Sequence, residues 1–251
     1  MIAGAALAQA SELLSRANSA VAFTGAGISE ESGLPTYRGE GGLWTQFDPY
    51  KVASIEEFHK DPTVYWSYSL SHRRIGADPN PAHLALVELE RAGRLRAVIT
   101  QNTDGLHQKA GSAEVIELHG SSANVICLDC EARYPRADID ALNRQHCPPS
   151  CPACGGRYLK PTVVLFGEPL PIPAFARAQA LAAEADVMLV VGSSLQVYPA
   201  AGIPRLAHDS GAELLIVNAE PTPFDSSARV VLHGKAGEIL PRIVSSIDGR
   251  R

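Results

Sequence analysis

The sequence lacks the features that mark several large classes of protein. None of its apolar stretches approaches the roughly 20 residues that a membrane-spanning helix needs, and the longest, such as Val187 to Val191, have the length of a strand. No run of five like charges occurs, and 22 Lys and Arg residues stand against 27 Asp and Glu residues, a net charge of −5. We therefore expect no membrane partner and no nucleic acid held by its phosphates.

The N-terminus lacks the basic leader of a secretory signal peptide. Residues 1–10 are rich in alanine, and Ala8-Gln9-Ala10 is similar to a cleavage site, but no Lys or Arg precedes it. Leu13, Leu14 and Arg16 extend the segment into an amphipathic helix that leads into a first strand. The 251 residues are 45% hydrophobic and 20% charged, a globular composition that excludes disorder, collagen and coiled coil. We expect a cytoplasmic protein.

Cysteine is scarce, yet four of the five cysteines form two close pairs. Cys127-x2-Cys130 and Cys151-x2-Cys154 are separated by twenty residues, a zinc-site spacing. Two disulfides would need an oxidising compartment, which nothing else in the chain supports. Four thiolates saturate a tetrahedral ion, so we predict one structural zinc held by these four residues. Cys147 is left over, either as an alternative to Cys151 at a poorer spacing or, more simply, as a free thiol.

The remaining sequence alternates short Val, Ile and Leu runs with helical patterns, which favours a parallel sheet with helices on both faces. We predict an α/β fold with a doubly wound, Rossmann-like sheet and a smaller insertion domain. The expected strands are Ala20–Thr24, Leu95–Thr100, Val115–Leu118, Thr162–Phe166, Asp186–Val191 and Glu213–Val217. We assign 1–33, 81–119 and 161–251 to the Rossmann-like domain, 34–80 to a helical insertion with a ligand-binding loop, and 120–160 to a zinc-binding insertion. Both insertions would form the small domain.

Each predicted strand is followed by small or polar residues. These sets are Gly25–Ser29, Gln101–Asp104, His119-Gly120, Gly167-Glu168, Gly192–Ser194 and Asn218–Glu220. Ligands of open parallel sheets bind outside the carboxyl ends of the strands, so one crevice is expected to gather all six sets.

The first set lacks two features of the dinucleotide-binding fingerprint. The third glycine after Gly25-x-Gly27 is missing, and the acidic ribose ligand about 20 residues further on is replaced by residues 41–45. The preceding strand still favours a turn whose glycines let backbone amides approach a pyrophosphate, over an ordinary strand-to-helix turn. Asn218 or Glu220 could supply the ribose contacts instead.

The first insertion contains both tryptophans, Trp44 and Trp66, and its second half, Ile55 to Ile75, has a helical and aromatic pattern. We favour a small satellite core over a ligand cage for these aromatics. Asn80-Pro81 predicts the start of the next helix, and Gly93 its end.

Seven motifs, in order and spacing from about residue 18 to 245, resemble those of sirtuins. They are the four cysteines, Gly25-Ala26-Gly27-Ile28-Ser29, Gly33-Leu34-Pro35-Thr36-Tyr37-Arg38-Gly39, Thr100-Gln101-Asn102-Thr103-Asp104, Leu118-His119-Gly120, Phe166-Gly167-Glu168 and Gly192-Ser193-Ser194. Sirtuins are NAD-dependent protein-lysine deacylases. The resemblance therefore implies NAD as cofactor and proteins or peptides containing acyl-lysine as partners. It also implies attack of the acyl oxygen on the nicotinamide ribose carbon, with nicotinamide, O-acyl-ADP-ribose and free lysine as products.

The resemblance also implies roles for individual residues. His119 would be the general base, because a strand-end imidazole that titrates near neutrality suits removal of a ribose hydroxyl proton. Asn102 and Asp104 would act with it by orienting the nicotinamide carboxamide and its ribose, with local loop capping as the structural alternative. The implied cofactor contacts are Gly25, Ala26, Gly27, Ser29, Tyr37, Arg38, Trp44, Gln101, Asn102, Asp104, Gly192, Ser193, Ser194, Asn218, Glu220 and Ala236. The implied substrate contacts are Val164, Phe166, Gly167, Glu168 and Val197, beside which the peptide would add as a strand.

Two positions depart from the sirtuin pattern. Tyr37 stands where the family usually has Phe in the loop that shields the nicotinamide pocket, a change that we expect to be tolerated. The Tyr-x-x-Arg pair with which the desuccinylating branch grips an acidic acyl group is absent. Tyr65 is followed at that spacing by Tyr68, and neither Arg73 nor Arg74 has a tyrosine three residues before it. We predict deacetylation, with longer neutral acyl chains left open, and weak action on succinyl-lysine.

Three other classes of function stay open beside this interpretation. A protein mono-ADP-ribosyltransferase would use the same NAD cleavage without releasing lysine. A dehydrogenase needs a hydride-acceptor site and usually the missing acidic residue. A non-catalytic zinc-ribbon binding module would leave His119, Asn102 and Asp104 without a role. The oligomeric state is also open, and the sequence is compatible with a monomer.

Overall fold

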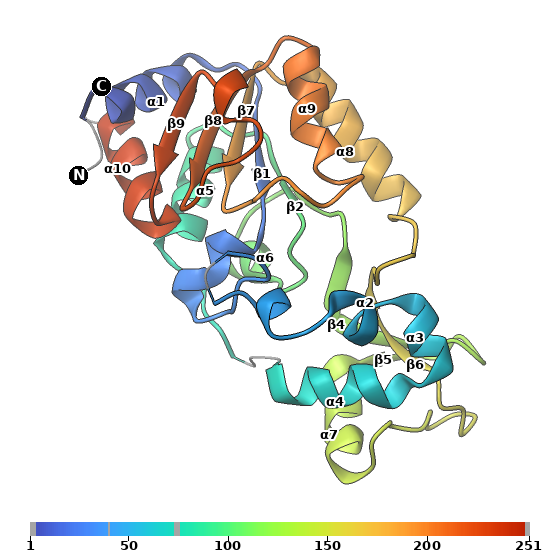
Figure 1. Ribbon diagram of the computed structural model, residues 1–251. Coiled ribbons are helices and arrows are strands. Elements are labelled where there is room, and N and C mark those ends of the chain that lie inside the picture. Colours follow the sequence, from blue (N-terminus) through green and yellow to red (C-terminus); the bar gives the residue numbers. More distant parts are fainter. Residues whose placement is uncertain (1–3, 40, 73–75, 249–251) are drawn as a thin grey trace.

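The computed structural model describes residues 4–39, 41–72 and 76–248 and consists of a large parallel sheet with helices, beside a small module (Figure 1). Arg73 and Arg74, which bear on the acyl preference, lie outside the described residues. The six strands of the large sheet are all parallel, in the order β3-β2-β1-β7-β8-β9. Their bounds are β1 Ala20–Thr24, β2 Ala97–Thr100, β3 Val115–Glu117, β7 Val187–Val191, β8 Glu213–Asn218 and β9 Val230–His233. The predicted doubly wound α/β fold is confirmed.

Helices cover both faces of the sheet, so its central strands are buried on both sides. In β1, Ala20 and Ala22 pack into one core and Val21 and Phe23 into the other, as alternation along a strand requires. Figure 1 shows α1 (Gly4–Arg16), α5 (Pro81–Arg91) and α10 (Ala236–Asp248) grouped on one side and α8 (Ile172–Glu184) and α9 (Gly202–Asp209) on the other. Burial on two faces explains why these strands are continuous apolar runs.

One predicted strand is wrong and one strand was missed. Thr162–Phe166 is not part of the parallel sheet. Its first two residues end β6 (Leu159–Val163), which pairs antiparallel with β4 (Gly120–Cys127) in a second sheet. A short apolar run is compatible with either kind of sheet, so the sequence did not distinguish them. The sixth parallel strand is instead β9, an edge strand of four residues that pairs only with β8.

The small module joins the two insertions through one core. The second insertion contributes β4, β5 (Arg133–Pro135), β6 and α7 (Arg136–Gln145), and the first contributes α2 (Pro49–Val52), α3 (Ile55–Lys60) and α4 (Pro62–His72). Phe58 and Trp66 from α3 and α4 pack with Ile139 and Leu159. The Trp66 indole also donates a hydrogen bond to the Leu159 carbonyl oxygen, 2.9 Å away. The satellite core expected for these aromatics is therefore confirmed for Trp66.

The helix expected after Asn80-Pro81 is α5. The Asn80 side chain accepts a hydrogen bond from the Ala82 amide at 2.9 Å, which caps the helix as predicted. The helix ends before Gly93, whose φ of 67° lies in the left-handed region that glycine favours. The short helices are α6 (Leu106–Ala110), η1 (Ala26–Ser32), η2 (Leu43–Thr45) and η3 (Asp225–Ser227). None of the described helices is both long and apolar enough to cross a bilayer.

Candidate active site

One cavity of about 1020 Å³ lies at the carboxyl ends of β1, β2, β3, β7 and β8 and reaches the small module. Members of all six polar sets predicted to converge line it, so the expected convergence is confirmed. Gly167-Glu168 lines the cavity from a different element than predicted. It follows β6 of the small sheet and not a strand of the parallel sheet.

Every residue implied as a contact of cofactor or substrate lines this cavity, and so does His119. From the large sheet's loops come Gly25, Ala26, Gly27, Ser29, Gln101, Asn102, Asp104, His119, Gly192, Ser193, Ser194, Val197, Asn218, Glu220 and Ala236. From the first insertion and from the segment that follows or ends β6 come Tyr37, Arg38, Trp44, Val164, Phe166, Gly167 and Glu168. The tertiary fold thus brings together side chains that are up to about 200 residues apart in sequence.

The glycines after β1 have a packing role that the sequence did not indicate. The amide of Gly25 donates to the Val191 carbonyl oxygen at 3.1 Å, and the amide of Gly27 donates to the Gly192 carbonyl oxygen at 2.9 Å. A Cβ on Gly27 would lie 2.8 Å from the Cα of Gly192, a distance that real Cβ atoms essentially never show. These two amides are therefore engaged within the protein, and the expectation that the turn approaches a pyrophosphate stays a prediction. The glycines are needed because the loops after β1 and β7 touch backbone to backbone.

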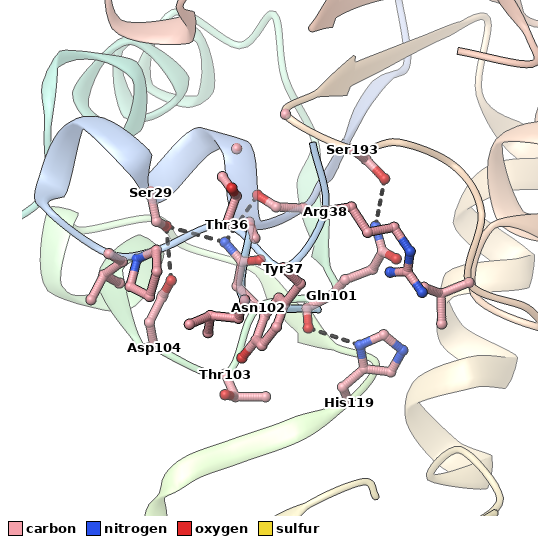
Figure 2. Close-up of a pocket in the computed structure, with 18 of the residues that line it drawn as sticks. Ser29, Thr36, Tyr37, Arg38, Gln101, Asn102, Thr103, Asp104, His119 and Ser193 are labelled. Carbon is pink, nitrogen blue, oxygen red and sulfur yellow. Dashed lines mark hydrogen bonds between the residues drawn. The ribbon is translucent and has the colours of Figure 1, made fainter. Parts of the chain in front are cut away.

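A hydrogen-bond network joins the loops after β1 and β2 (Figure 2). The Ser29 hydroxyl donates to Asp104 Oδ2 at 2.8 Å and accepts from Asn102 Nδ2 at 3.1 Å. Asn102 Nδ2 also donates to the Gly25 carbonyl oxygen at 3.1 Å. Both amide protons of Asn102 are therefore engaged, and its Oδ1 is the atom left to accept a bond from a ligand. Asp104 also caps the Leu106 amide at 2.9 Å, so the loop-capping alternative holds for this residue as well.

The orientation of His119 is fixed by the backbone of the neighbouring strand end. Its Nδ1 lies 2.9 Å from the Gln101 carbonyl oxygen, as Figure 2 shows. Because a carbonyl oxygen can only accept, Nδ1 carries the proton, and Nε2 of the neutral ring is an unprotonated acceptor. Burial lowers the pKa of His119 below the usual histidine value, and the bond to Gln101 opposes this shift only in part. The ring is therefore a neutral base at pH 7.

A second contact ties the loop after β2 to the loop after β7. Gln101 Nε2 donates to the Ser193 hydroxyl at 2.7 Å. The same hydroxyl accepts from the Leu195 amide at 3.3 Å, which turns the chain towards Val197. One residue thus uses its backbone to hold His119 and its side chain to hold Ser193.

Aromatic rings form the wall of the cavity nearest the small module. Tyr37 stacks on Trp44 with ring centroids 5.0 Å apart, and Trp44 meets the edge of Phe166 at 6.3 Å. Tyr50 packs on Phe166 at 5.0 Å. Trp44 is therefore part of the cavity wall, unlike Trp66, so the satellite-core expectation for the aromatic insertion is only half right.

Sequence reasoning missed two buried histidines beneath the site. His83 Nε2 lies 3.5 Å from the Ser29 hydroxyl, and burial lowers the pKa of His83 to about 4. His107 Nε2 lies 2.9 Å from the Thr24 hydroxyl, and burial lowers the pKa of His107 to about 3. Neither histidine directly follows a strand, because His83 lies in α5 and His107 in α6. The third position of the helix after Asn80-Pro81 was the available signal for His83.

An ion pair between Lys160 and Glu168 joins the two ends of the segment that carries Val164 and Phe166. Lys160 Nζ donates to Glu168 Oε2 at 2.8 Å and to the Val163 carbonyl oxygen at 2.7 Å. Glu168 Oε2 also accepts from the Leu165 amide at 2.8 Å. Lys160 and Glu168 therefore form a clip around the residues between them.

The four predicted zinc ligands form one cluster at the end of the small module. Their Sγ atoms all lie within 4.8 Å of one another, and the Cys127–Cys154 and Cys130–Cys151 distances are both 3.7 Å. A tetrahedron with Zn–S bonds of about 2.3 Å has edges of about 3.8 Å, so the cluster fits a zinc ion. Cys147 lies outside the cluster, with its Sγ 3.5 Å from the Ser67 hydroxyl, which decides the ligand in favour of Cys151.

Comparison with known proteins yields close matches over nearly the whole chain. A protein-family model described as the Sir2 family matches residues 25–199. A protein of Archaeoglobus fulgidus named NAD-dependent protein deacylase 2 is 50% identical over 245 residues, covering 97% of this chain and 96% of that protein. A solved Sir2 structure with a myristoylated histone peptide superposes with a TM-score of 0.87 at 44% identity, covering 99% of each chain. A second Sir2 structure, with a deacetylated p53 peptide and 3′-O-acetyl-ADP-ribose, gives a TM-score of 0.92 at 38% identity, covering 94% of this chain and 96% of that one.

Proposed function

The chain belongs to the Sir2 family and is an NAD-dependent protein-lysine deacylase, and from this premise we propose which of its residues perform the reaction. The observation that carries the proposal is the geometry of one cavity. Within it, Nε2 of His119 is a free acceptor, and the engaged amide of Asn102 leaves its Oδ1 free. When bound, NAD supplies an electrophilic ribose carbon, from which nicotinamide departs as the acyl-lysine oxygen arrives.

His119 acts as the general base. The Gln101 carbonyl oxygen holds the proton on Nδ1, so Nε2 takes up a proton from a ribose hydroxyl. The lowered pKa of His119 keeps this nitrogen unprotonated at pH 7. Replacement by alanine removes the base and leaves the Asn102 network in place, because His119 is bonded to neither Asn102 nor Ser29.

Asn102 and Asp104 orient the nicotinamide end of the cofactor. Asn102 Oδ1 accepts a hydrogen bond from the carboxamide nitrogen, the pairing that its engaged Nδ2 leaves open. Asp104 is held by the Ser29 hydroxyl and the Leu106 amide, which fixes its carboxylate before the cofactor arrives. Preorganisation of this kind would hold the nicotinamide end of bound NAD in one orientation.

The other end of the cavity holds the rest of NAD. Arg38 pairs with the pyrophosphate through its fork of donors, and Asn218 and Glu220 bind the adenosine ribose. The remaining contacts are Gly25, Ala26, Gly27, Ser29, Tyr37, Trp44, Gln101, Gly192, Ser193, Ser194 and Ala236. Asn218 is already anchored, because its Nδ2 donates to the Glu220 carbonyl oxygen at 2.7 Å.

The acyl-lysine peptide lies between Gly167-Glu168 and the segment that contains Val197, adding as a strand. Val164 and Phe166 line the tunnel for the lysine methylenes, whose apolar walls disfavour a free ammonium. Among the described residues, the acyl end meets rings rather than an available charge. Arg136 lines the cavity, but its Nε is bonded to Asp140 at 2.6 Å. This supports acetyl and longer neutral acyl groups, consistent with the myristoylated peptide bound to the relative, and disfavours succinyl groups.

We also propose which residues form each domain of the chain. Residues 1–33, 81–119 and 161–251 form the NAD-binding domain, 34–80 its helical insertion and cofactor-binding loop, and 120–160 the zinc-binding insertion. The two insertions together form the small domain. A cytoplasmic location is supported by the five free thiols, four of which suit zinc and none of which is in a disulfide among the described residues.

Mass spectrometry of acetyl-, myristoyl- and succinyl-lysine peptides, with and without NAD, tests the proposal. The native protein should release lysine and form O-acyl-ADP-ribose, His119→Ala should form neither, and succinyl-lysine should be the poorest peptide. His208→Ala is the matched control, because this histidine of α9 lies outside the cavity lining and should keep full activity. If NAD is consumed while the peptides stay acylated, the alternative of mono-ADP-ribosyl transfer replaces deacylation.

A further inference from the structure

One tyrosine of the small module contacts the metal cluster directly. Tyr134 lies on β5 opposite Val125 of β4, and its hydroxyl oxygen is 3.2 Å from the Sγ of Cys151. The amide of Ala153 donates to the same hydroxyl oxygen at 3.2 Å. Because an amide can only donate, the oxygen accepts at Ala153, and the hydroxyl proton is free to point at the sulfur.

The sulfur that receives this bond is one that water does not reach. Four thiolates around Zn²⁺ leave a net charge of about −2, which must be solvated or hydrogen-bonded. Cys130 and Cys154 are exposed, whereas Cys151 is only 3% exposed. Across residues 4–39, 41–72 and 76–248, Tyr134 is the one non-cysteine side chain with a hydrogen bond to any of the four sulfurs. Cys127 is also buried, but among these residues its sulfur meets only backbone amides and other cysteines, whereas Tyr134 adds a side-chain donor to the backbone amides at Cys151.

We propose that Tyr134 is the outer-shell donor that sets the zinc affinity of this cluster. Its hydroxyl stabilises the thiolate of Cys151, while its bond from Ala153 fixes the turn that carries both Cys151 and Cys154. Partners of this kind orient metal ligands and raise metal affinity by about 10- to 100-fold. Tyr134 is a positioning residue, since it acts on the ion through Cys151.

The same module provides a matched control. Tyr158 also packs against the core of the small module, and its hydroxyl donates to the His59 carbonyl oxygen at 3.2 Å rather than to a cysteine sulfur. Tyr134→Phe and Tyr158→Phe therefore each remove one oxygen and one donated hydrogen bond from the same module. They differ in that Tyr134→Phe takes the donor from a zinc thiolate and also leaves the exposed Ala153 amide to water.

The test is zinc competition between the full-length protein and a chromogenic chelator, followed as zinc transfer at fixed pH. Tyr134→Phe should raise the zinc dissociation constant about 10- to 100-fold, whereas Tyr158→Phe should leave it within about twofold of the native value. An unchanged constant in Tyr134→Phe, or an equal rise in both variants, would overturn the proposal. The second outcome would mean that general destabilisation of the module, and not loss of the sulfur's donor, weakens zinc.

A spectroscopic measurement keeps the proposal testable if Tyr134→Phe is poorly folded without metal. In the Co²⁺-substituted protein, the thiolate-to-cobalt charge-transfer band should move to lower energy in Tyr134→Phe, because an unbonded thiolate is the better electron donor. Tyr158→Phe should show the native band. A Tyr134→Phe band identical to the native one would contradict the hydrogen bond to Cys151, whatever the stability of the variant.

Discussion

Replacing Lys160 with methionine should lower the free energy of unfolding by about 3 kcal/mol. The Lys160 side chain is 8% exposed, and its Nζ donates to Glu168 Oε2 and to the Val163 and Pro161 carbonyl oxygens at 2.8, 2.7 and 3.3 Å. Removing one partner of a buried ion pair costs about 3–5 kcal/mol, because the other charge stays behind uncompensated. Glu168 is 24% exposed, so water partly solvates its carboxylate and the lower end of this range applies. In a chain of this size, the melting temperature should fall by roughly 6–12 °C.

The assay is thermal unfolding by circular dichroism with zinc in excess, and Lys60→Met is its matched control. Lys60 lies 2.7 Å from Glu56 and 2.9 Å from Glu57 but is 58% exposed, so solvent screens both pairs. The same substitution there should leave the melting temperature close to native. Equal shifts in the two variants, or a native melting temperature in Lys160→Met, would refute the argument from burial.

The same substitution should weaken peptide binding selectively. The clip holds the ends of the segment that carries Val164 and Phe166, whereas NAD contacts lie mainly on the loops of the large sheet. We expect the KM for the acyl-lysine peptide to rise about tenfold, equivalent to ~1.4 kcal/mol, and the KM for NAD to stay unchanged. Lys160→Arg, which keeps the charge, should recover part of the peptide affinity. A parallel rise in both KM values would contradict the role of the clip.

Three further predictions concern protons and zinc. Because burial lowers the pKa of His119, the acid limb of the pH profile of kcat/KM should have its midpoint below the usual histidine value of about 6.5. A midpoint above pH 7 would contradict this. His83 takes up a proton near pH 6.5 when unfolded but only near pH 4 when folded, so this residue alone should lower the free energy of unfolding by about 2 kcal/mol from pH 7 to pH 5, and His107 should add to the loss. Urea unfolding at both pH values checks this, and His83→Gln should show the smaller dependence. Chelation of zinc should unfold the small module, seen as lost near-ultraviolet dichroism, and abolish deacylation indirectly, whereas metal-free protein that stays folded and active would show that zinc is not structural.

Most of the large sheet could be predicted from the sequence because its strands are buried on both faces. Continuous apolar runs such as Val187–Val191, ended by small polar residues, give a signal that does not depend on partners far along the chain. The zinc cluster could be predicted equally well, since the ligand spacing within each cysteine pair is local. The small polar residues at the ends of these strands are also local features, and they predicted the position of the cavity.

The rest depended on contacts that local sequence does not encode. Pairing with β4, about 40 residues earlier, decides which sheet residues 162–166 approach. The apolar run itself is compatible with either sheet. The glycines after β1 suggested free amides, yet Val191 and Gly192 take both of them up. His83 resembled an ordinary helix residue, because only the fold places its ring beside Ser29.

The position of β1 in the middle of the sheet has a consequence for synthesis on the ribosome. In the sheet, β1 lies between β2 and β7. The ribosome makes β2 first, whereas β7 emerges about 160 residues after β1. At roughly 5–20 residues per second, one edge of the apolar strand Ala20–Thr24 has no native partner for about 8–30 s. Nascent chains should therefore be most prone to mispairing during this interval. A stall or truncation before residue 187 should produce aggregation-prone species.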